Sequence, residues 1–311
     1  MSGKPPSPKT PRANLRRPPF RVCLSGMLMA AWAGAAWAEP AAPGAESALR
    51  VDFGDTALVE QPCPPLPEAL AAFLKAPADT PPSIDAVKGY TAYTKFEQAN
   101  DWAGLCRYRE ENRRAAAQAP PKVVFMGDSI TENWRRYDPG FFPVGFIDRG
   151  VSGQTTPQMV VRFYQDVIAL HPRVVHIMGG TNDLAGNTGP IGDDTFKNNI
   201  TAMVDLARAN GVAVVLASIP PAEKFSWRPD LKPAAKIVAL NQWLAAFARQ
   251  RGLTFVDYTA ALANPAGGLR ADLSRDGVHP NKAGYDLMEP LTLKAIAEAE
   301  KPRGRSSGSG R

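Results

Sequence analysis

Three side chains that could catalyse acyl transfer stand in two short segments far apart in the chain. Ser129 follows the apolar run 123–126 and Gly127, and Asp276 precedes His279 by three residues. A serine hydroxyl attacks an acyl carbon when a base takes its proton. In a turn, a carboxylate at this spacing can accept from Nδ1 of the histidine and leave Nε2 for the serine. The pattern predicts a nucleophile, a base and a residue that orients the base.

Two glycine-containing turns offer donors for the negative charge that acyl transfer develops on oxygen. Gly153 has no side chain to cover its backbone N–H, and the Asn182 amide can donate a second bond. With the backbone N–H of Ser129 they make three candidate oxyanion-hole donors. Each residue also has an ordinary interpretation, with Ser129 as a helix cap and the glycines as loop residues.

The other two histidines have simpler explanations. His171 precedes a proline at the end of a predicted helix and is expected at the surface. His176 lies inside an apolar run and is expected to be a hydrogen-bonded core residue. Of the three histidines in the chain, His279 is therefore the candidate base.

The elements that must position these residues alternate short apolar runs with amphipathic segments. This alternation predicts an α/β fold in which a parallel five-stranded sheet carries helices on both faces. Ser129 would then lie at the carboxyl end of a strand, where open α/β sheets bind ligands. The strands are expected at 123–126, 146–148, 174–178, 212–218 and 253–257, and the helices at 158–170, 195–210, 234–250 and 282–300.

Composition divides the chain into four parts. Residues 1–38 combine a basic head, an apolar run and the sequence Ala-Trp-Ala, which is typical of a cleaved export signal. A membrane anchor is the alternative, but alanine and glycine dilute the apolar run. Residues 39–120 form an extension with helices expected at 68–74 and 93–114, packed on a main domain at 121–300. Residues 301–311 are expected to be a disordered basic tail.

The charge distribution bears on partners and location. The leader holds six of the 36 basic side chains and none of the 30 acidic ones, so the chain after it has no formal net charge. This balance gives no support to a nucleic-acid-binding body. We expect an exported protein, periplasmic or secreted, that is not inserted in a membrane after signal cleavage. The sequence leaves the oligomeric state open.

Cys63 and Cys106 are the two cysteines that remain after the leader. Export leads to an oxidising compartment, which favours a disulfide between them. The alternative is two unpaired, buried cysteines.

Four short blocks occur in a fixed order along the main domain. They are Gly127-Asp128-Ser129, Gly153 in Ser-Gly-Gln-Thr, Asn182 in Gly-Thr-Asn-Asp, and Asp276-x-x-His279. Together they resemble the SGNH hydrolases, also called the GDSL esterase/lipase family. The resemblance implies a flavodoxin-like three-layer sandwich and a serine esterase mechanism without a metal or organic cofactor. It makes Ser129 the nucleophile, His279 the base, Asp276 its orienter, and Ser129, Gly153 and Asn182 the oxyanion hole.

Two details qualify the resemblance. Ile130 stands where the family motif has leucine, which should alter packing alone. Thr131 stands where the second glycine of a G-x-S-x-G elbow would be, so the α/β-hydrolase alternative is disfavoured.

The sequences around the first and third blocks are similar to those of the branch that includes acetylhydrolases of platelet-activating-factor type and bacterial carbohydrate acetylesterases. This similarity implies a short acyl group, such as an O-acetyl group on a glycan. The side chains expected to line a small acyl pocket are Trp134, Met178, Ile219 and Pro220. A lysophospholipase or arylesterase using the same site is the close alternative. A non-catalytic protein that binds a glycan or another partner is the alternative from a different class.

Overall fold

The computed structural model describes residues 63–78 and 80–301. The predicted export signal at 1–38, the beginning of the extension and residues 302–311 of the tail lie outside the described residues. Within the described part, no helix combines the length and the apolar character needed to cross a bilayer.

Five parallel strands form a sheet in the order β2-β1-β3-β4-β5, as the flavodoxin-like prediction requires. In the first pairings, Gly127 stands opposite both Gly150 and Met178, so three strands end level with one another. The loops that follow them therefore begin side by side, where the strand order reverses. The strands are β1 (Val123–Gly127), β2 (Phe146–Gly150), β3 (Val174–Met178), β4 (Ala213–Ala217) and β5 (Thr254–Val256).

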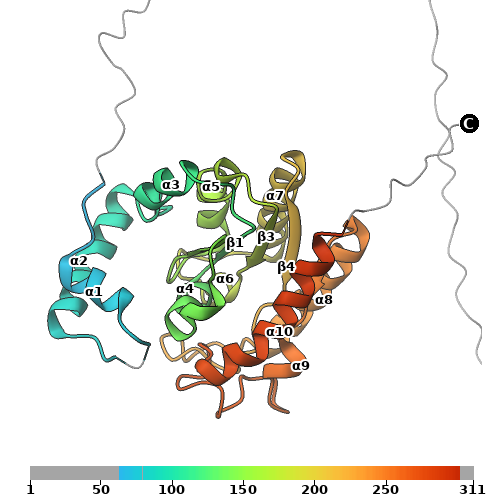
Figure 1. Ribbon diagram of the computed structural model, residues 1–311. Coiled ribbons are helices and arrows are strands. Elements are labelled where there is room, and N and C mark those ends of the chain that lie inside the picture. Colours follow the sequence, from blue (N-terminus) through green and yellow to red (C-terminus); the bar gives the residue numbers. More distant parts are fainter. Residues whose placement is uncertain (1–62, 79, 302–311) are drawn as a thin grey trace, which may run out of the picture. The chain divides into compact units, whose positions relative to one another are not determined.

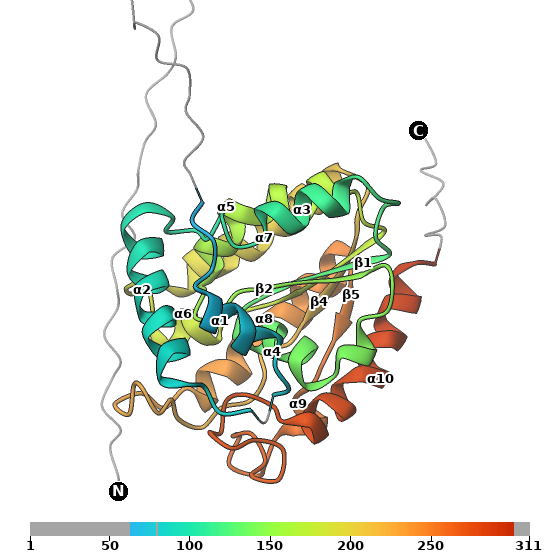
Figure 2. The same cartoon turned by 60° about the vertical axis from the view of Figure 1, so that its left-hand side comes forward.

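Helices cover both faces of this sheet because the strands are apolar on both. Val124 and Met126 pack into a core cluster with α5, α7 and α8, whereas Phe125 packs into a second cluster with α4, α9 and α10. Figure 2 shows the sheet between these layers. The helices of this part are α4 (Ser129–Tyr137), α5 (Thr156–Asp166), α6 (Thr181–Ala185), α7 (Asp193–Ala209), α8 (Ala234–Arg251), α9 (Thr259–Leu262) and α10 (Lys282–Ala299), with short 3-10 turns η1 (Pro139–Phe141) and η2 (Ile168–Leu170).

Aromatic packing fixes α4 against α10. The buried Trp134 ring of α4 stacks on Phe141, with centroids 4.6 Å apart, and on Tyr285 of α10 at 5.4 Å. The Tyr285 hydroxyl donates to the backbone carbonyl of Ile130 at 2.7 Å. The first turn of α4 and the start of α10 are thereby held in one arrangement.

The described part of the extension, from residue 63 onward, contains the helices α1 (Glu68–Lys75), α2 (Ile84–Asn100) and α3 (Arg109–Ala116). Figure 1 shows α1 and α2 side by side, in blue and blue-green. The prediction of one helix over 93–114 is wrong, because the chain turns at 101–108. There the Asp101 carboxylate accepts from the backbone N–H groups of Leu105 and Cys106, each at 2.8 Å. Such local bonds from an aspartate compete with a helical ladder.

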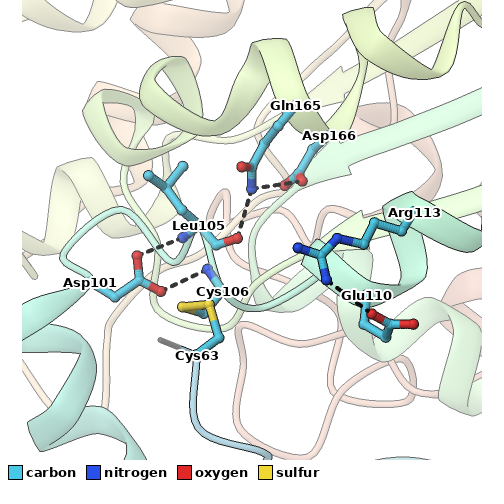
Figure 3. The surroundings of a disulfide bond; sticks show 8 residues. All are labelled: Cys63, Asp101, Leu105, Cys106, Glu110, Arg113, Gln165 and Asp166. Carbon is cyan, nitrogen blue, oxygen red and sulfur yellow. Dashed lines mark hydrogen bonds and ion pairs between the residues drawn. A yellow bond between two sulfur atoms is a disulfide. The ribbon is translucent and has the colours of Figure 1, made fainter. Parts of the chain in front are cut away.

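A disulfide joins Cys63 to Cys106, as predicted, with the two Cα atoms 5.3 Å apart. Figure 3 shows the bridge beside the turn that Asp101 closes. The bridge ties the residues just before α1 to the turn between α2 and α3, and so closes a loop that contains both α1 and α2.

Candidate active site

Ser129 is the first residue of α4 and is separated from the end of β1 by Asp128 alone. The helix cap is Asp128, whose carboxylate accepts from the Ile130 N–H at 2.9 Å. The alternative that Ser129 serves as the cap is therefore wrong. Burial raises the pKa of Asp128 to about 6, against the lowering effect of the Ile130 bond.

The Ser129 hydroxyl lies 2.9 Å from Nε2 of His279, a residue 150 positions further along the chain. His279 stands in the loop before α10, and its Nδ1 lies 2.6 Å from a carboxylate oxygen of Asp276. The other oxygen of Asp276 accepts from the backbone N–H groups of Val278 and His279, at 2.9 and 2.8 Å. The three side chains predicted to act together thus form a continuous hydrogen-bonded series.

These hydrogen bonds raise the pKa of His279 and lower the pKa of Asp276, and both shifts favour an ion pair between the two side chains. Burial alone would lower the pKa of His279, but the hydrogen bond and charge of Asp276 outweigh it and raise that pKa above its ordinary value. For Asp276, burial acts to raise the pKa, and bonds and charge from His279 outweigh it, so the carboxyl stays ionised. An ionised carboxylate on Nδ1 stabilises the imidazolium that forms when Nε2 takes a proton.

Gly153 lies on the loop after β2, and Asn182 lies in α6, the short helix after β3. Both residues line one cavity with Ser129 and His279. Gly153 has φ +80°, a backbone conformation that favours glycine. The Asn182 amide nitrogen donates to the Gln154 carbonyl at 2.9 Å and makes a longer contact of 3.4 Å to Asp128. The longer contact is the weaker of the two.

The turn that carries Gly153 is held by an ion pair that the sequence motifs did not indicate. The Arg107 guanidinium, from the turn between α2 and α3, lies 2.8 Å from the Glu132 carboxylate of α4, and both side chains are about nine-tenths buried. The second Glu132 oxygen accepts from the Ser152 N–H at 3.1 Å and also from the Ser152 hydroxyl. Arg107 and Glu132 are 25 residues apart and share no motif, so nothing local in the sequence pairs them.

Other bonds join the same two segments. The Tyr108 hydroxyl donates to the Gly150 carbonyl at 2.5 Å, and the Gln154 side chain donates to the Ala103 carbonyl at 2.8 Å. Gly150 itself has no room for a side chain, since a Cβ there would lie 2.2 Å from the Glu132 backbone nitrogen. The extension therefore contacts the loop that holds a predicted oxyanion donor.

The cavity in front of Ser129 has a volume of about 800 Å³ and is walled on one side by the extension. Its catalytic-domain side carries Ser129, Gly153, Asn182, His279 and Trp227. The opposite side consists of residues from α1, α2 and their connections. The sequence pattern placed the extension on the main domain but gave no sign that it completes this cavity.

The four residues predicted to line an acyl pocket lie elsewhere. Trp134, Met178 and Ile219 are at most 1% exposed, and Pro220 is also buried. None of these four lines the cavity in the described part of the chain. The prediction is corrected on a physical ground. They are near the motifs in sequence, but long-range packing places Trp134 and Met178 in one core cluster and Ile219 in the other. Pro220 is buried next to Ile219 in the chain.

The remaining histidines have no place in the site. His176 is fully buried on β3, with Nε2 2.9 Å from the Tyr258 hydroxyl, and burial lowers its pKa to about 3. His171 is exposed at the end of η2. Among the described residues, Asp138, Asp286 and Glu289 could bring three carboxylate oxygens together, but Lys282 already pairs with both aspartates.

A parallel sheet with a serine, a histidine and an aspartate hydrogen-bonded at its carboxyl edge is the arrangement expected of an acyl-transferring hydrolase. The chain belongs to the GDSL-like lipase/acylhydrolase family, whose sequence model matches residues 125–287. That match begins after the helices of the extension.

Solved structures agree with this assignment. A Bacteroides fragilis protein proposed to be an acylhydrolase is 43% identical, with a TM-score of 0.62 over 65% of this chain and 100% of that one. A GDSL-like lipase from Bacteroides thetaiotaomicron is 44% identical, with a TM-score of 0.60 over 63% of this chain and 98% of that one. The uncharacterized lipoprotein YqeF of Bacillus subtilis is 31% identical over 120 residues, which cover 32% of this chain and 48% of that one. The chain thus spans about half the length of this curated relative.

Proposed function

We propose that this chain hydrolyses carboxylic esters, with Ser129 as nucleophile and His279 as base. The observation that carries the proposal is the 2.9 Å approach of the Ser129 hydroxyl to Nε2 of His279. That distance is within the range for direct proton transfer to a catalytic base. Family membership and the predicted roles of these residues point to the same reaction.

In the proposed reaction, the Ser129 oxygen bonds to the ester carbon while its proton moves to Nε2 of His279. The carbonyl electrons move onto oxygen, and the N–H groups of Ser129 and Gly153 bind the resulting oxyanion. The Asn182 amide supplies a third donor by exchanging its long contact with Asp128 for one with the oxyanion. When the tetrahedral species collapses, the alcohol oxygen leaves with the proton from Nε2. A water molecule then repeats both steps on the acyl-serine.

We also propose that the protein is exported and acts in the periplasm or outside the cell. The basic and apolar leader supports this, as does the disulfide, which forms and persists in oxidising compartments. The curated relative in Bacillus subtilis is named a lipoprotein, a class of exported proteins.

Two substrate classes fit the proposed chemistry. The wording of the motifs supports short acyl groups, such as O-acetyl groups on glycans. The second candidate is an ester with a larger apolar part, such as a lysophospholipid or an aryl ester, and the apolar wall of the cavity favours it. The short-acyl candidate loses one of its supports, because the four residues expected to close a small pocket are buried and do not line the cavity.

Hydrolysis of p-nitrophenyl acetate and p-nitrophenyl butanoate by the purified protein tests the proposal. We expect turnover that disappears in Ser129→Ala and after treatment with a serine-directed phosphonate, and that persists in the presence of a chelator. Activity no higher than that of Ser129→Ala would favour the alternative of a non-catalytic binding protein. Loss of activity on chelation would instead indicate a metal-dependent mechanism.

A further inference from the structure

One side of the cavity comes from the extension and is largely apolar. Its lining includes Leu66, Leu70, Phe73, Leu74, Val87 and Tyr90. Val87 is 51% exposed and Tyr90 50% exposed, although both side chains face a concave surface. Apolar surface that is exposed inside a cavity next to a reactive hydroxyl is typical of a ligand-binding site.

The cavity extends along one face of α4. Ser129, Glu132, Asn133 and Arg136 all line it, at the spacing of residues that share a helical face. Seven residues of helix separate the ends of this row, which corresponds to about 10 Å. At the far end, the Arg136 guanidinium lies over the Phe73 ring of α1, 4.4 Å from its centroid. The part of the cavity between this row and the extension is therefore an elongated compartment with Ser129 at one end, while Asn187, Thr188 and Trp227 line the rest of the cavity.

Several bonds hold the walls of this compartment in place. The Cys63–Cys106 disulfide closes the loop that contains α1 and α2, and the Gln158 side chain donates to the Trp102 carbonyl at 2.5 Å. Burial raises the pKa of Glu97, which also lines the cavity, to about 7. A carboxyl group titrates so high when its surroundings solvate charge poorly.

From this geometry we propose that α1 and α2 form a binding site for the acyl group of the ester. The protein would then hydrolyse esters of medium-length apolar acyl groups more efficiently than acetyl esters. This inference rests on the proposed function. In the acyl-enzyme the acyl group remains bonded to Ser129, at the end of the compartment, whereas the alcohol must take a proton from His279 and depart. The part of the substrate that stays is the part that an elongated apolar compartment can hold. The family match begins after α1 and α2, so these helices lie outside the region that defines the family.

Two isomeric esters test the inference, because ethyl octanoate carries its long chain on the acyl side and octyl acetate carries it on the alcohol side. In the oxidised full-length protein, we expect kcat/KM for ethyl octanoate to exceed that for ethyl acetate, mainly through KM. Val87→Asp and Tyr90→Asp should each lower kcat/KM for ethyl octanoate about tenfold, because they remove apolar surface from about two methylene groups. They should leave ethyl acetate and octyl acetate within about twofold.

Ile84→Asp is the matched control. Ile84 is an apolar residue of α2 with 76% exposure, and it is not among the residues that line the cavity. Its substitution should change none of these rates. A larger effect of Val87→Asp on octyl acetate than on ethyl octanoate would overturn the inference in favour of an alcohol-binding wall. Equal effects on all esters, or none, would also overturn it while the esterase proposal stood. Hydrolysis no faster than by Ser129→Ala on any ester would end both.

Discussion

Replacing Arg107 by methionine should lower turnover without touching the reacting residues. Arg107 neutralises the buried Glu132 carboxylate, and the same carboxylate holds both the N–H and the hydroxyl of Ser152, next to Gly153. Without the guanidinium, Glu132 keeps a buried charge with Ser152 as its remaining strong partner. The carboxylate is then expected to move toward water and take Ser152 with it.

The size of the effect follows from the burial of the pair. With side chains 12% and 9% exposed, loss of one partner belongs to the range of about 3–5 kcal/mol measured for buried ion pairs. If most of this appears as displacement of Gly153 and not as unfolding, kcat falls as if one oxyanion donor were lost, by about 10²-fold. Arg107 and Glu132 line the cavity but do not belong to its apolar wall on α1 and α2, so KM for an ester held by that wall should stay within about twofold.

The assay is steady-state kinetics of one ester with Arg107→Met, Glu132→Gln and the double variant, alongside thermal unfolding of each. The double variant leaves no unpaired charge, so its loss of kcat should be smaller than the product of the two single losses. Lys88→Met removes an exposed ion pair of the same extension and should change neither constant. Unchanged kcat in Arg107→Met with a lower melting temperature would show that the pair supports the fold alone, and strictly multiplicative losses would refute the shared linkage through Glu132.

Three further predictions concern the site and its supports. A base must be neutral, and Asp276 raises the pKa of His279, so kcat/KM should rise with pH through a midpoint above about 6.5. Asp276→Asn should move that midpoint lower and reduce kcat by about 10⁴. An unmoved midpoint in the pH–rate profile would contradict the assignment of Asp276. His176→Leu should reduce thermal stability, since it breaks the buried bond to Tyr258, and should leave kcat within about threefold. A folded but inactive variant would contradict the assignment of His279 as the base. The cysteines are 43 residues apart, so removing the bridge with Cys63→Ser and Cys106→Ser should lower the free energy of unfolding by about 4 kcal/mol. Scanning calorimetry should show a melting temperature about 10 °C lower. Equal melting temperatures of the unaltered protein and the double variant would contradict this prediction.

Local sequence predicted the elements of the sheet and the residues that meet at its edge. The five strand positions follow from short apolar runs, and β3 has the predicted bounds at 174–178. Ser129, Asp276 and His279 were predicted as a group, and the structure brings them within hydrogen-bond distance, while their roles remain predictions. Such success is expected where each motif specifies its own turn and the parallel sheet brings the turns together.

The failures share a physical cause, which is that side-chain partners distant in sequence decided the outcome. Trp134 is large and apolar and follows Ser129 by a little over one turn of helix, yet Tyr285 and Phe141 hold it in the core. The helix expected over 93–114 is interrupted because Asp101 offers acceptors to the backbone ahead of it. Arg107 and Glu132 form their ion pair through tertiary packing, which no periodicity encodes.

The 150-residue interval between Ser129 and His279 also orders events during synthesis. A ribosome delivers the extension, the first strand and the serine long before it adds the loop that bears the imidazole. A chain interrupted within that interval lacks His279. Its Ser129 hydroxyl then keeps an ordinary pKa and does not attack esters unaided. If Ser129 and His279 act as proposed, nascent and prematurely terminated copies do not hydrolyse the esters of the cell that makes them.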